Sequence, residues 1–189
     1  MNTETDKSKY ITLAIIVLVL VVAGYFAYKA ISKNKTDQVE NSPAGSALVS
    51  TDGESKYTDI NGNALFLDDY LGRVLVVNSW ASWSPQSAQE LVSFATVVEQ
   101  YSDTDVVLLA INRAEPKETA QAFLNSISVA DSVVLVLDPT DNYYEAIEGF
   151  AMPETLFYDT SGNVVAHKRG SITENEMKEH IQSAINASE

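Results

Sequence analysis

The sequence predicts an α/β domain, a mixed central sheet flanked by helices, preceded by one transmembrane helix. Two observations lead to this prediction: short apolar runs alternate with helix-like patterns along most of the 189 residues, and one long apolar segment lies near the N-terminus. A chain of this length holds one membrane segment and one domain large enough for a real hydrophobic core.

The long apolar segment is Tyr10–Ile31, in which Lys29 is the one charged residue. About 20 helical residues cross the roughly 30 Å of hydrocarbon in a bilayer, so this segment is long enough to span it. An interfacial aromatic belt is expected near its end, and three aromatic residues lie there: Tyr25, Phe26 and Tyr28. A cleaved signal peptide would need small residues at positions −3 and −1 before the cut, but a cut after Ala27 or Ala30 places Tyr25 or Tyr28 at position −3. We therefore expect an uncleaved anchor.

Composition divides the chain into four parts. A short tail covers residues 1–9, the anchor covers 10–31, a flexible tether covers 32–54, and the folded domain covers 55–189. The tether is rich in Ser, Thr, Gly, Asn and Asp, which favours a flexible chain. Lysines flank the anchor on both sides, so the positive-inside rule does not fix its orientation. These features predict a single-pass protein of the cell membrane.

Strands are predicted at three valine-rich runs, 74–77, 106–111 and 133–137. Continuous apolar runs of this length are typical of central strands that are covered on both faces. Two further apolar stretches, 156–158 and 164–166, flank a loop that contains Gly and Asn. This arrangement predicts a β-hairpin.

Three helices longer than the short one before the hairpin are predicted between and after these strands. An apolar stripe at helical spacing predicts the first, and its residues are Leu91, Phe94, Ala95 and Val98. The second is expected over 116–126, with Pro116 at its start and three residues facing inward: Ala120, Phe123 and Leu124. Thr173 and Glu176 form a T-x-x-E capping box that predicts the start of the last helix. The predicted order is strand, strand, helix, strand, helix, strand, short helix, β-hairpin, helix, which is typical of a mixed sheet between helices.

Composition also excludes several kinds of chemistry. The chain has no cysteine, so it supplies no disulfide, thiolate nucleophile or thiolate metal ligand. Its two histidines, His167 and His180, are expected to be surface or partly buried side chains, because a zinc site needs about three or four convergent ligands. The Asp138–Asn142 stretch lacks the ligand spacing and the glycine of an EF-hand loop, so it predicts a turn. We expect no metal and no cofactor.

The domain is strongly acidic. From Thr36 onward the sequence contains 7 Lys/Arg and 24 Asp/Glu, within a formal charge of −14 for the whole chain. Such a surface repels phosphate backbones, so we expect no nucleic-acid partner. The charge either attracts a basic partner or only keeps the domain soluble.

The segment Asn78–Ser87, NSWASWSPQS, resembles the active-site segment V-N-F-W-A-S-W-C-P-P-C of a known family. This family is the membrane-anchored thioredoxin-like proteins of the TlpA/ResA/DsbE type, a redoxin family of thiol-disulfide oxidoreductases. The residues that fit its pattern are Asn78, Trp80, Ala81, Ser82, Trp83 and Pro85. The resemblance implies a thioredoxin fold, and it implies that Ser84 and Ser87 occupy the positions of the two redox cysteines.

Further motifs extend the resemblance from about Lys56 to Ile185. Segments 59–63 and 67–73 are similar to the family's opening hairpin and D-L-x-G-K turn, and Glu90 lies where the family often has an acidic residue. Segment 149–159 resembles the G-x-P-E-T-F-x-x-D stretch, which implies a cis peptide bond before Pro153. The family's domain faces the extracytoplasmic side of the membrane, and the same side is implied here.

Serine in these positions removes the family's chemistry. In a C-x-x-C site the helix N-terminus lowers the pKa of the first thiol, its thiolate attacks a disulfide, and the second sulfur resolves the product. Serine instead predicts a helix cap, with Ser84 as N-cap and Pro85 at the first helical position, worth roughly 1 kcal/mol. A hydrolytic Ser84 would need a base within hydrogen-bond reach, and the candidates are His167 and a Glu90 of strongly raised pKa.

The leading functional hypothesis is a redox-inactive module that binds a peptide or an envelope protein, or acts as a scaffold, at the membrane. In thioredoxin-like folds the start of the C-x-x-C helix and the loop before the cis-proline form a groove in which backbone groups pair with an extended peptide. The resemblance places seven residues there: Trp83, Ser84, Pro85, Ser87, Ala151, Met152 and Pro153. Asn78 and Glu90 are candidates for support, although Glu90 could also be a solvated helix residue. The alternative is a thiol-disulfide oxidoreductase or peroxiredoxin-related enzyme, which the absence of cysteine opposes unless another chain supplies a thiol.

Overall fold

The computed structural model describes Leu48 and residues 54–189. The expected anchor at 10–31 and most of the expected tether at 32–54 lie outside these residues. Within the described part of the chain, no helix is long and apolar enough to cross a membrane.

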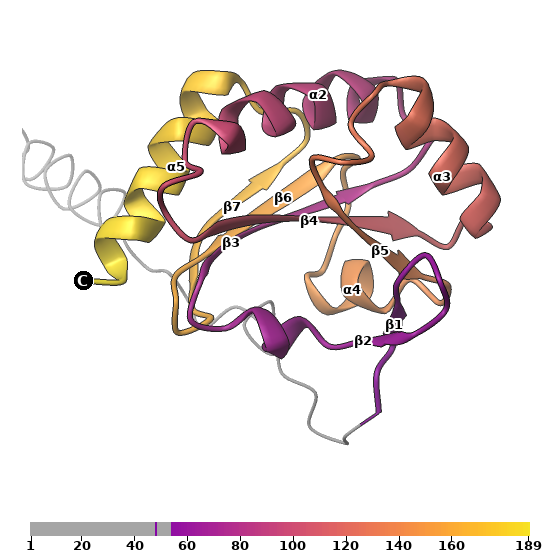
Figure 1. The fold of residues 1–189 in the computed structure, drawn as a ribbon, viewed down its shortest axis with the longest axis horizontal. Helices are drawn as coiled ribbons and strands as arrows, with labels where there is room; N and C mark the ends of the chain where they lie inside the picture. Colours follow the sequence, from indigo (N-terminus) through magenta and orange to yellow (C-terminus); the bar gives the residue numbers. More distant parts are fainter. Residues whose placement is uncertain (1–47, 49–53) are drawn as a thin grey trace, which may run out of the picture. The chain divides into compact units, whose positions relative to one another are not determined.

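The described residues form one mixed sheet of seven strands in the order β2-β1-β5-β4-β3-β6-β7 (Figure 1). Its central strands β3, β4 and β5 run parallel, and their bounds are Val74–Trp80, Val106–Arg113 and Val134–Asp138. All three lie at the predicted valine-rich runs, which confirms those strands. The runs are continuously apolar because helices cover both faces of the sheet at its centre.

Antiparallel pairs complete the sheet at both edges. Strands β6 (Glu154–Tyr158) and β7 (Val164–Arg169) form the hairpin predicted from the sequence. At the opposite edge β1 (Tyr57–Thr58) pairs with β2 (Ala64–Leu65), which is the opening hairpin that the resemblance implied. The mixed sheet expected from the sequence is therefore confirmed.

Helices lie on both faces of this sheet (Figure 1). Helices α2 (Pro85–Glu99), α3 (Lys117–Ser126) and α5 (Glu174–Ala187) cover one face, and the short α4 (Asn142–Ala146) covers the other. The predicted second helix is confirmed, with Pro116 as its N-cap. The predicted capping box is also confirmed: Thr173 and Glu176 hydrogen-bond reciprocally at the start of α5.

Alternation along β3 separates two packing layers. Val76 packs with Phe94 of α2 and Ile181 of α5. Its neighbours Leu75 and Val77 point to the opposite face and pack in the cluster around Tyr143 of α4. Successive side chains of a strand face opposite sides, so one strand contributes to both layers.

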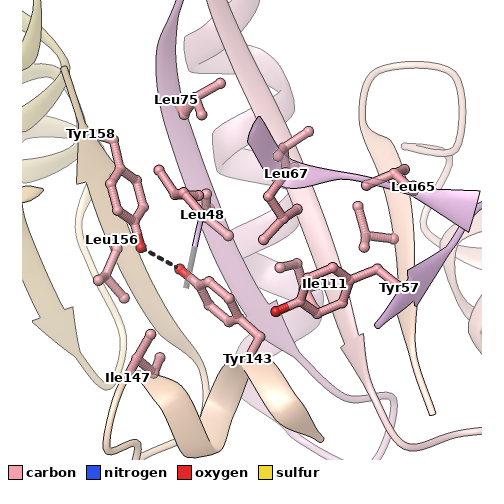
Figure 2. Packing of buried hydrophobic residues seen from close by; sticks show 13 residues of the cluster. Leu48, Tyr57, Leu65, Leu67, Leu75, Ile111, Tyr143, Ile147, Leu156 and Tyr158 are labelled. Carbon is pink, nitrogen blue, oxygen red and sulfur yellow. Dashed lines mark hydrogen bonds between the residues drawn. The ribbon is translucent and has the colours of Figure 1, made fainter. Parts of the chain in front are cut away.

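The layer around α4 also contains Leu48, which is fully buried (Figure 2). Figure 2 shows it among Leu67, Leu75 and the paired tyrosines Tyr143 and Tyr158, whose hydroxyl oxygens are 3.0 Å apart. We expected Leu48 to belong to the tether and the domain to begin at residue 55. The packed unit instead reaches upstream to Leu48, because this apolar side chain is removed from water in the core.

Candidate functional site

The segments that the resemblance singled out meet at one end of the central strands. Ser79 near the end of β3 lies opposite Glu154 at the start of the antiparallel β6, and Trp80 lies opposite Asn112 of the parallel β4. The chain that follows β3 and β4 and the chain that precedes β6 therefore leave the sheet at the same end. Ligands of α/β proteins commonly bind outside the carboxyl ends of such strands.

The start of α2 carries Ser84 and Ser87. Ser84 is the N-cap and Pro85 the first helical residue, as predicted, and the Ser87 amide donates to the Ser84 carbonyl at 3.1 Å. The predicted side-chain cap is wrong: the Ser84 hydroxyl makes no capping hydrogen bond. Both hydroxyl oxygens are buried without a hydrogen-bond partner, in residues that are 3% and 0% exposed. The first turn of α2 also contains no acidic residue, so its positive end is not neutralised locally.

Glu90 on the second turn of α2 is buried in a polar cluster. Its Oε1 accepts from Asn78 Nδ2 at 2.7 Å and from Thr155 Oγ1 at 3.1 Å, and its Oε2 accepts from the Ile172 amide at 2.9 Å. Burial raises the pKa of Glu90 to about 7, although these hydrogen bonds oppose the rise. The interpretation of Glu90 as a solvated residue is therefore wrong, because strands β3 and β6 and the segment before α5 enclose it.

A second carboxylate holds the loop between β3 and α2. Glu115 accepts from the Ser82 amide at 2.8 Å, from the Ser82 hydroxyl at 2.5 Å, and from Asn112 Nδ2 at 2.7 Å. The loop that ends in Trp83 is thus tied to the end of β4.

The two tryptophans differ in their surroundings. Trp80 is fully buried and stacks on Phe123 of α3, with the ring centroids 5.2 Å apart. Trp83 is 63% exposed, and Phe150 in the loop before β6 is 77% exposed. Large exposed aromatic side chains at the end of a sheet suit binding more than packing.

The loop before β6 has a defined backbone. The Met152–Pro153 bond is cis, as the resemblance implied. Glu154 Oε1 accepts from the amides of Phe150 and Ala151, both at 2.7 Å, and the Ala151 carbonyl also has a hydrogen-bond partner. Pro153 has no N–H. Among the described residues, no hydrogen bond involves Met152, so its backbone amide and carbonyl are free.

A serine-hydrolase arrangement is absent from the described residues. His167 Nε2 lies 2.8 Å from Glu154 Oε2 on the neighbouring strand, and burial lowers the pKa of His167. Glu90 is engaged by Asn78, Thr155 and Ile172 instead of Ser84. Neither candidate base bonds the Ser84 hydroxyl.

A pocket of about 370 Å³ adjoins Glu90, between α2 and the start of α5. It is lined by Gln86, Gln89, Glu90, Ser93, Ser171, Ile172, Thr173 and Glu174. No group of three or more potential metal ligands occurs in the part of the chain that the structure describes. The stretch after Asp138 is a turn, as expected, in which Asp138 Oδ2 accepts from the Tyr143 amide.

Sequence reasoning found the motif positions but missed their supporting partners. Thr155 and Ile172 reach Glu90 from β6 and from the segment before α5, and Glu115 reaches Ser82 from the end of β4. The P-E-T motif contained Thr155, but nothing in the sequence linked it to Glu90. No local pattern marked Ile172 or Glu115.

Comparisons with known proteins agree with this architecture. Residues 51–167 match the profile of the AhpC/TSA family. The thiol-disulfide oxidoreductase ResA of Geobacillus kaustophilus is 26% identical over 170 residues, which cover 90% of this chain and 92% of that protein. A putative thiol:disulfide interchange protein DsbE from Chlorobium tepidum has a similar solved structure, with a TM-score of 0.62, 20% identity, and coverage of 71% of this chain and 99% of that chain. A putative thioredoxin from Neisseria meningitidis gives a TM-score of 0.61 at 17% identity, covering 69% and 87%. The thioredoxin-like fold is thereby confirmed.

Proposed function

Because the chain belongs to the AhpC/TSA family, we propose that it is a thioredoxin-like module without thiol chemistry of its own, which binds an extended peptide or protein segment at the membrane. Ser84 and Ser87 stand, in this proposal, at the positions of the two cysteines of its oxidoreductase relatives. One observation carries it: a chain without cysteine has two buried, unpartnered serine hydroxyls at the start of α2.

Physical chemistry makes these two positions better suited to sulfur than to a hydroxyl. Leaving a buried hydroxyl without a hydrogen bond costs about 1–3 kcal/mol. A thiol is a weak donor that behaves as a small apolar group, so it avoids most of this cost. The free positive end of α2 would also favour a thiolate, because its first turn holds no carboxylate. Serine keeps the shape of such a site and removes its nucleophile.

The binding role rests on the groups that remain free. We define the peptide surface as the seven residues expected from the resemblance: Trp83, Ser84, Pro85, Ser87, Ala151, Met152 and Pro153. Trp83 offers an exposed aromatic ring, and Met152 offers an unpaired amide and carbonyl. Strand addition needs free backbone groups that pair with the peptide main chain, as Met152 has, and a side chain that contacts the peptide, as Trp83 has. Asn78 and Glu90 support this surface from beneath.

The cellular setting is part of the proposal. Residues 10–31 anchor the protein in the cell membrane, the chain between this anchor and Leu48 acts as the tether, and the domain lies on the extracytoplasmic side. The partner is then an extended segment of an envelope protein, and no nucleic acid is bound.

The second candidate is an oxidoreductase, which the activity named for the ResA relative favours. In this chain both steps of thiol–disulfide exchange would depend on cysteines supplied by another protein.

Insulin reduction with dithiothreitol separates the two candidates. We expect the full chain in detergent to give the protein-free rate, and the double variant Ser84→Cys plus Ser87→Cys to form an intramolecular disulfide and reduce insulin. The Ser84→Cys thiol should titrate below the ~8.5 of a free cysteine because of the helix start. A native rate above background would favour the enzyme. A folded double variant that stays dithiol under oxidising conditions would mean that the serines do not occupy the cysteine positions.

Peptide binding is tested with a displayed library of random short peptides, from which the enriched peptide is synthesised with a fluorescent label. We expect Trp83→Ala to weaken its binding about tenfold, which corresponds to roughly 1.4 kcal/mol. Val92→Ala is the control, because Val92 is also an exposed apolar side chain but lies on α2 away from the helix start. If no peptide is enriched, or if both variants bind equally well, the binding proposal fails.

A further inference from the structure

Tyr144 on the short helix α4 holds the loop that precedes β6. Its hydroxyl donates to the Ala151 carbonyl at 2.8 Å, and its own carbonyl accepts from the Gly149 amide at 2.9 Å. The ring also packs directly on the Gly149 backbone, since a Cβ added to this glycine would lie 2.4 Å from the ring carbon Cε2. Tyr144 thus makes three contacts with the loop before β6, two through its side chain and one through its backbone.

Arg113 at the end of β4 fixes the ring of Tyr144. Its guanidinium carbon lies 3.3 Å from the centroid of the Tyr144 ring, in a cation–π contact. The same guanidinium forms a two-point ion pair with Asp141, the N-cap residue of α4, with Nε to Oδ1 at 2.8 Å. Because the planar guanidinium is held by Asp141 while it stacks on the ring, it keeps the Tyr144 ring in one orientation. The sheet edge is therefore connected through Arg113 and Tyr144 to Ala151.

We propose that Tyr144, braced by Arg113, is a positioning residue for the peptide surface, an inference that rests on the proposed function. The Tyr144 hydroxyl donates to the Ala151 carbonyl, and the Glu154 carboxylate accepts from the amides of Phe150 and Ala151, so these groups are already hydrogen-bonded. Met152 is then the residue of this loop whose amide and carbonyl are both left for a peptide. The hydroxyl of Tyr144 thereby sets the register in which an extended segment pairs with the loop.

Tyr144 and Arg113 both keep their protonation state at neutral pH. Burial, with the negative charge of Glu154, raises the pKa of Tyr144 above its ordinary value, so the phenol remains a donor. Arg113 is always charged.

The test uses the full chain in detergent and the pair Tyr144→Phe and Tyr143→Phe. Tyr144→Phe removes the hydroxyl that bonds Ala151 and leaves the ring in place. Tyr143→Phe is the control: it removes a hydroxyl from the neighbouring position, where the partner is the buried Tyr158 instead of the loop. Amide hydrogen exchange at Phe150 and Ala151 and the affinity for the labelled library peptide are measured for both.

We expect Tyr144→Phe to speed exchange at Phe150 and Ala151 about tenfold and to weaken peptide binding about fivefold, as loss of one ordering hydrogen bond allows. Arg113→Lys should give a smaller change in the same direction. Tyr143→Phe should lower the melting temperature and change neither readout. Unchanged exchange in Tyr144→Phe, or faster exchange with unchanged affinity, would overturn the inference. If the native chain binds no peptide, the proposed function fails, and the exchange result alone decides whether Tyr144 positions the loop.

Discussion

Helices α2 and α5 begin with similar sequence signals, but the two helix starts are built differently. At α5 the Glu176 amide donates to Thr173 Oγ1 at 3.3 Å, and the Thr173 amide donates to Glu176 Oε2 at 2.9 Å. Hydrogen bonds from Lys168 and then from Thr173 lower the pKa of Glu176 to about 2, so a carboxylate faces the helix dipole. At α2 the cap position is filled by Ser84, but its hydroxyl caps nothing. One helix start is stabilised locally, and the other leaves its positive end available.

Buried polar atoms without a hydrogen-bond partner are concentrated near the start of α2. Within the described residues, the buried side-chain atoms without a partner are Asn78 Oδ1, Ser79 Oγ, Trp80 Nε1, Ser84 Oγ, Ser87 Oγ and Asn112 Oδ1. All of them belong to the ends of β3 and β4 or to the start of α2. Deep in the core, by contrast, the hydroxyls of Tyr143 and Tyr158 pair with each other. Buried polar groups without partners are uncommon, and their concentration at one edge marks the candidate site.

Glu90 joins the two helix starts, because it sits on α2 and accepts from the amide of Ile172, next to the cap of α5. Its pKa of about 7 in the folded chain exceeds the ordinary 4.5, so protonation favours the folded state. The stabilisation is fully present below about pH 4.5 and is lost as the pH rises through about 7, for a total of at most about 3 kcal/mol. We expect Glu90→Gln to remove this pH dependence from the free energy of unfolding in urea.

The comparison of native and Glu90→Gln proteins isolates this carboxyl from His167. Burial lowers the pKa of His167, so its contribution has the opposite sign and grows as the pH rises through the unfolded value. His167 contacts Glu154 and not Glu90, and its effect should be common to both proteins. An equally steep loss of stability in the variant would show that Glu90 is ionised throughout this range.

Ser87→Ala should raise the free energy of unfolding by about 1 kcal/mol, because it removes a fully buried hydroxyl that has no partner. Ser183→Ala on α5 is the control, since the exposed Ser183 hydroxyl donates to the Glu179 carbonyl and its loss should change stability little. Chemical denaturation of both variants measures the difference. Destabilisation by Ser87→Ala would reveal a hydrogen bond that the buried hydroxyl makes in solution.

Much of the fold could be predicted from the sequence because its strongest signals are local. Central strands need long apolar runs, and the runs at 74–77, 106–111 and 133–137 contain little else. β3 continues beyond its run through Asn78 to Trp80, and its polar residues Asn78 and Ser79 are as fully buried as the apolar ones. Leu48 was missed because the apolar run Ala47-Leu48-Val49, in an otherwise polar segment, is too short to show a periodicity.

The candidate site was predictable only in part. The resemblance implied that Ser84 lies at the start of the helix and that Pro153 follows a cis bond, and the structure has both. The burial of Glu90 was not predictable, because Thr155 and Ile172, which surround it, are far away in the sequence. The Tyr144 contact with Ala151 depends on how α4 is tied to Arg113, which no local pattern records.

Thr173→Ala should lower the free energy of unfolding by about 1 kcal/mol, the usual cost of losing a side-chain N-cap. The variant loses the bond from the Glu176 amide and the bond from the Thr173 hydroxyl to the Glu176 carboxylate, which keeps Lys168 and the backbone amide of residue 173 as donors. Urea denaturation measures the loss, and Thr173→Ser should restore most of it. A cost near zero for Thr173→Ala would remove the contrast between the two helix starts.

Ser84→Ala should not lower the free energy of unfolding: like Ser87→Ala, it removes a buried hydroxyl without a partner, so a gain of up to about 1 kcal/mol is expected. The same substitution at a working cap costs about 0.5–2 kcal/mol, but here the Ser87 amide already bonds the Ser84 backbone carbonyl, and the hydroxyl bonds nothing. The measurement is the urea series used for Thr173→Ala, so that the two caps are compared under identical conditions. A cost equal to that of Thr173→Ala would mean that the Ser84 hydroxyl caps α2 in solution. The positive end of α2 would then be satisfied by its own serine, and it could no longer be counted as free to favour a thiolate at this position.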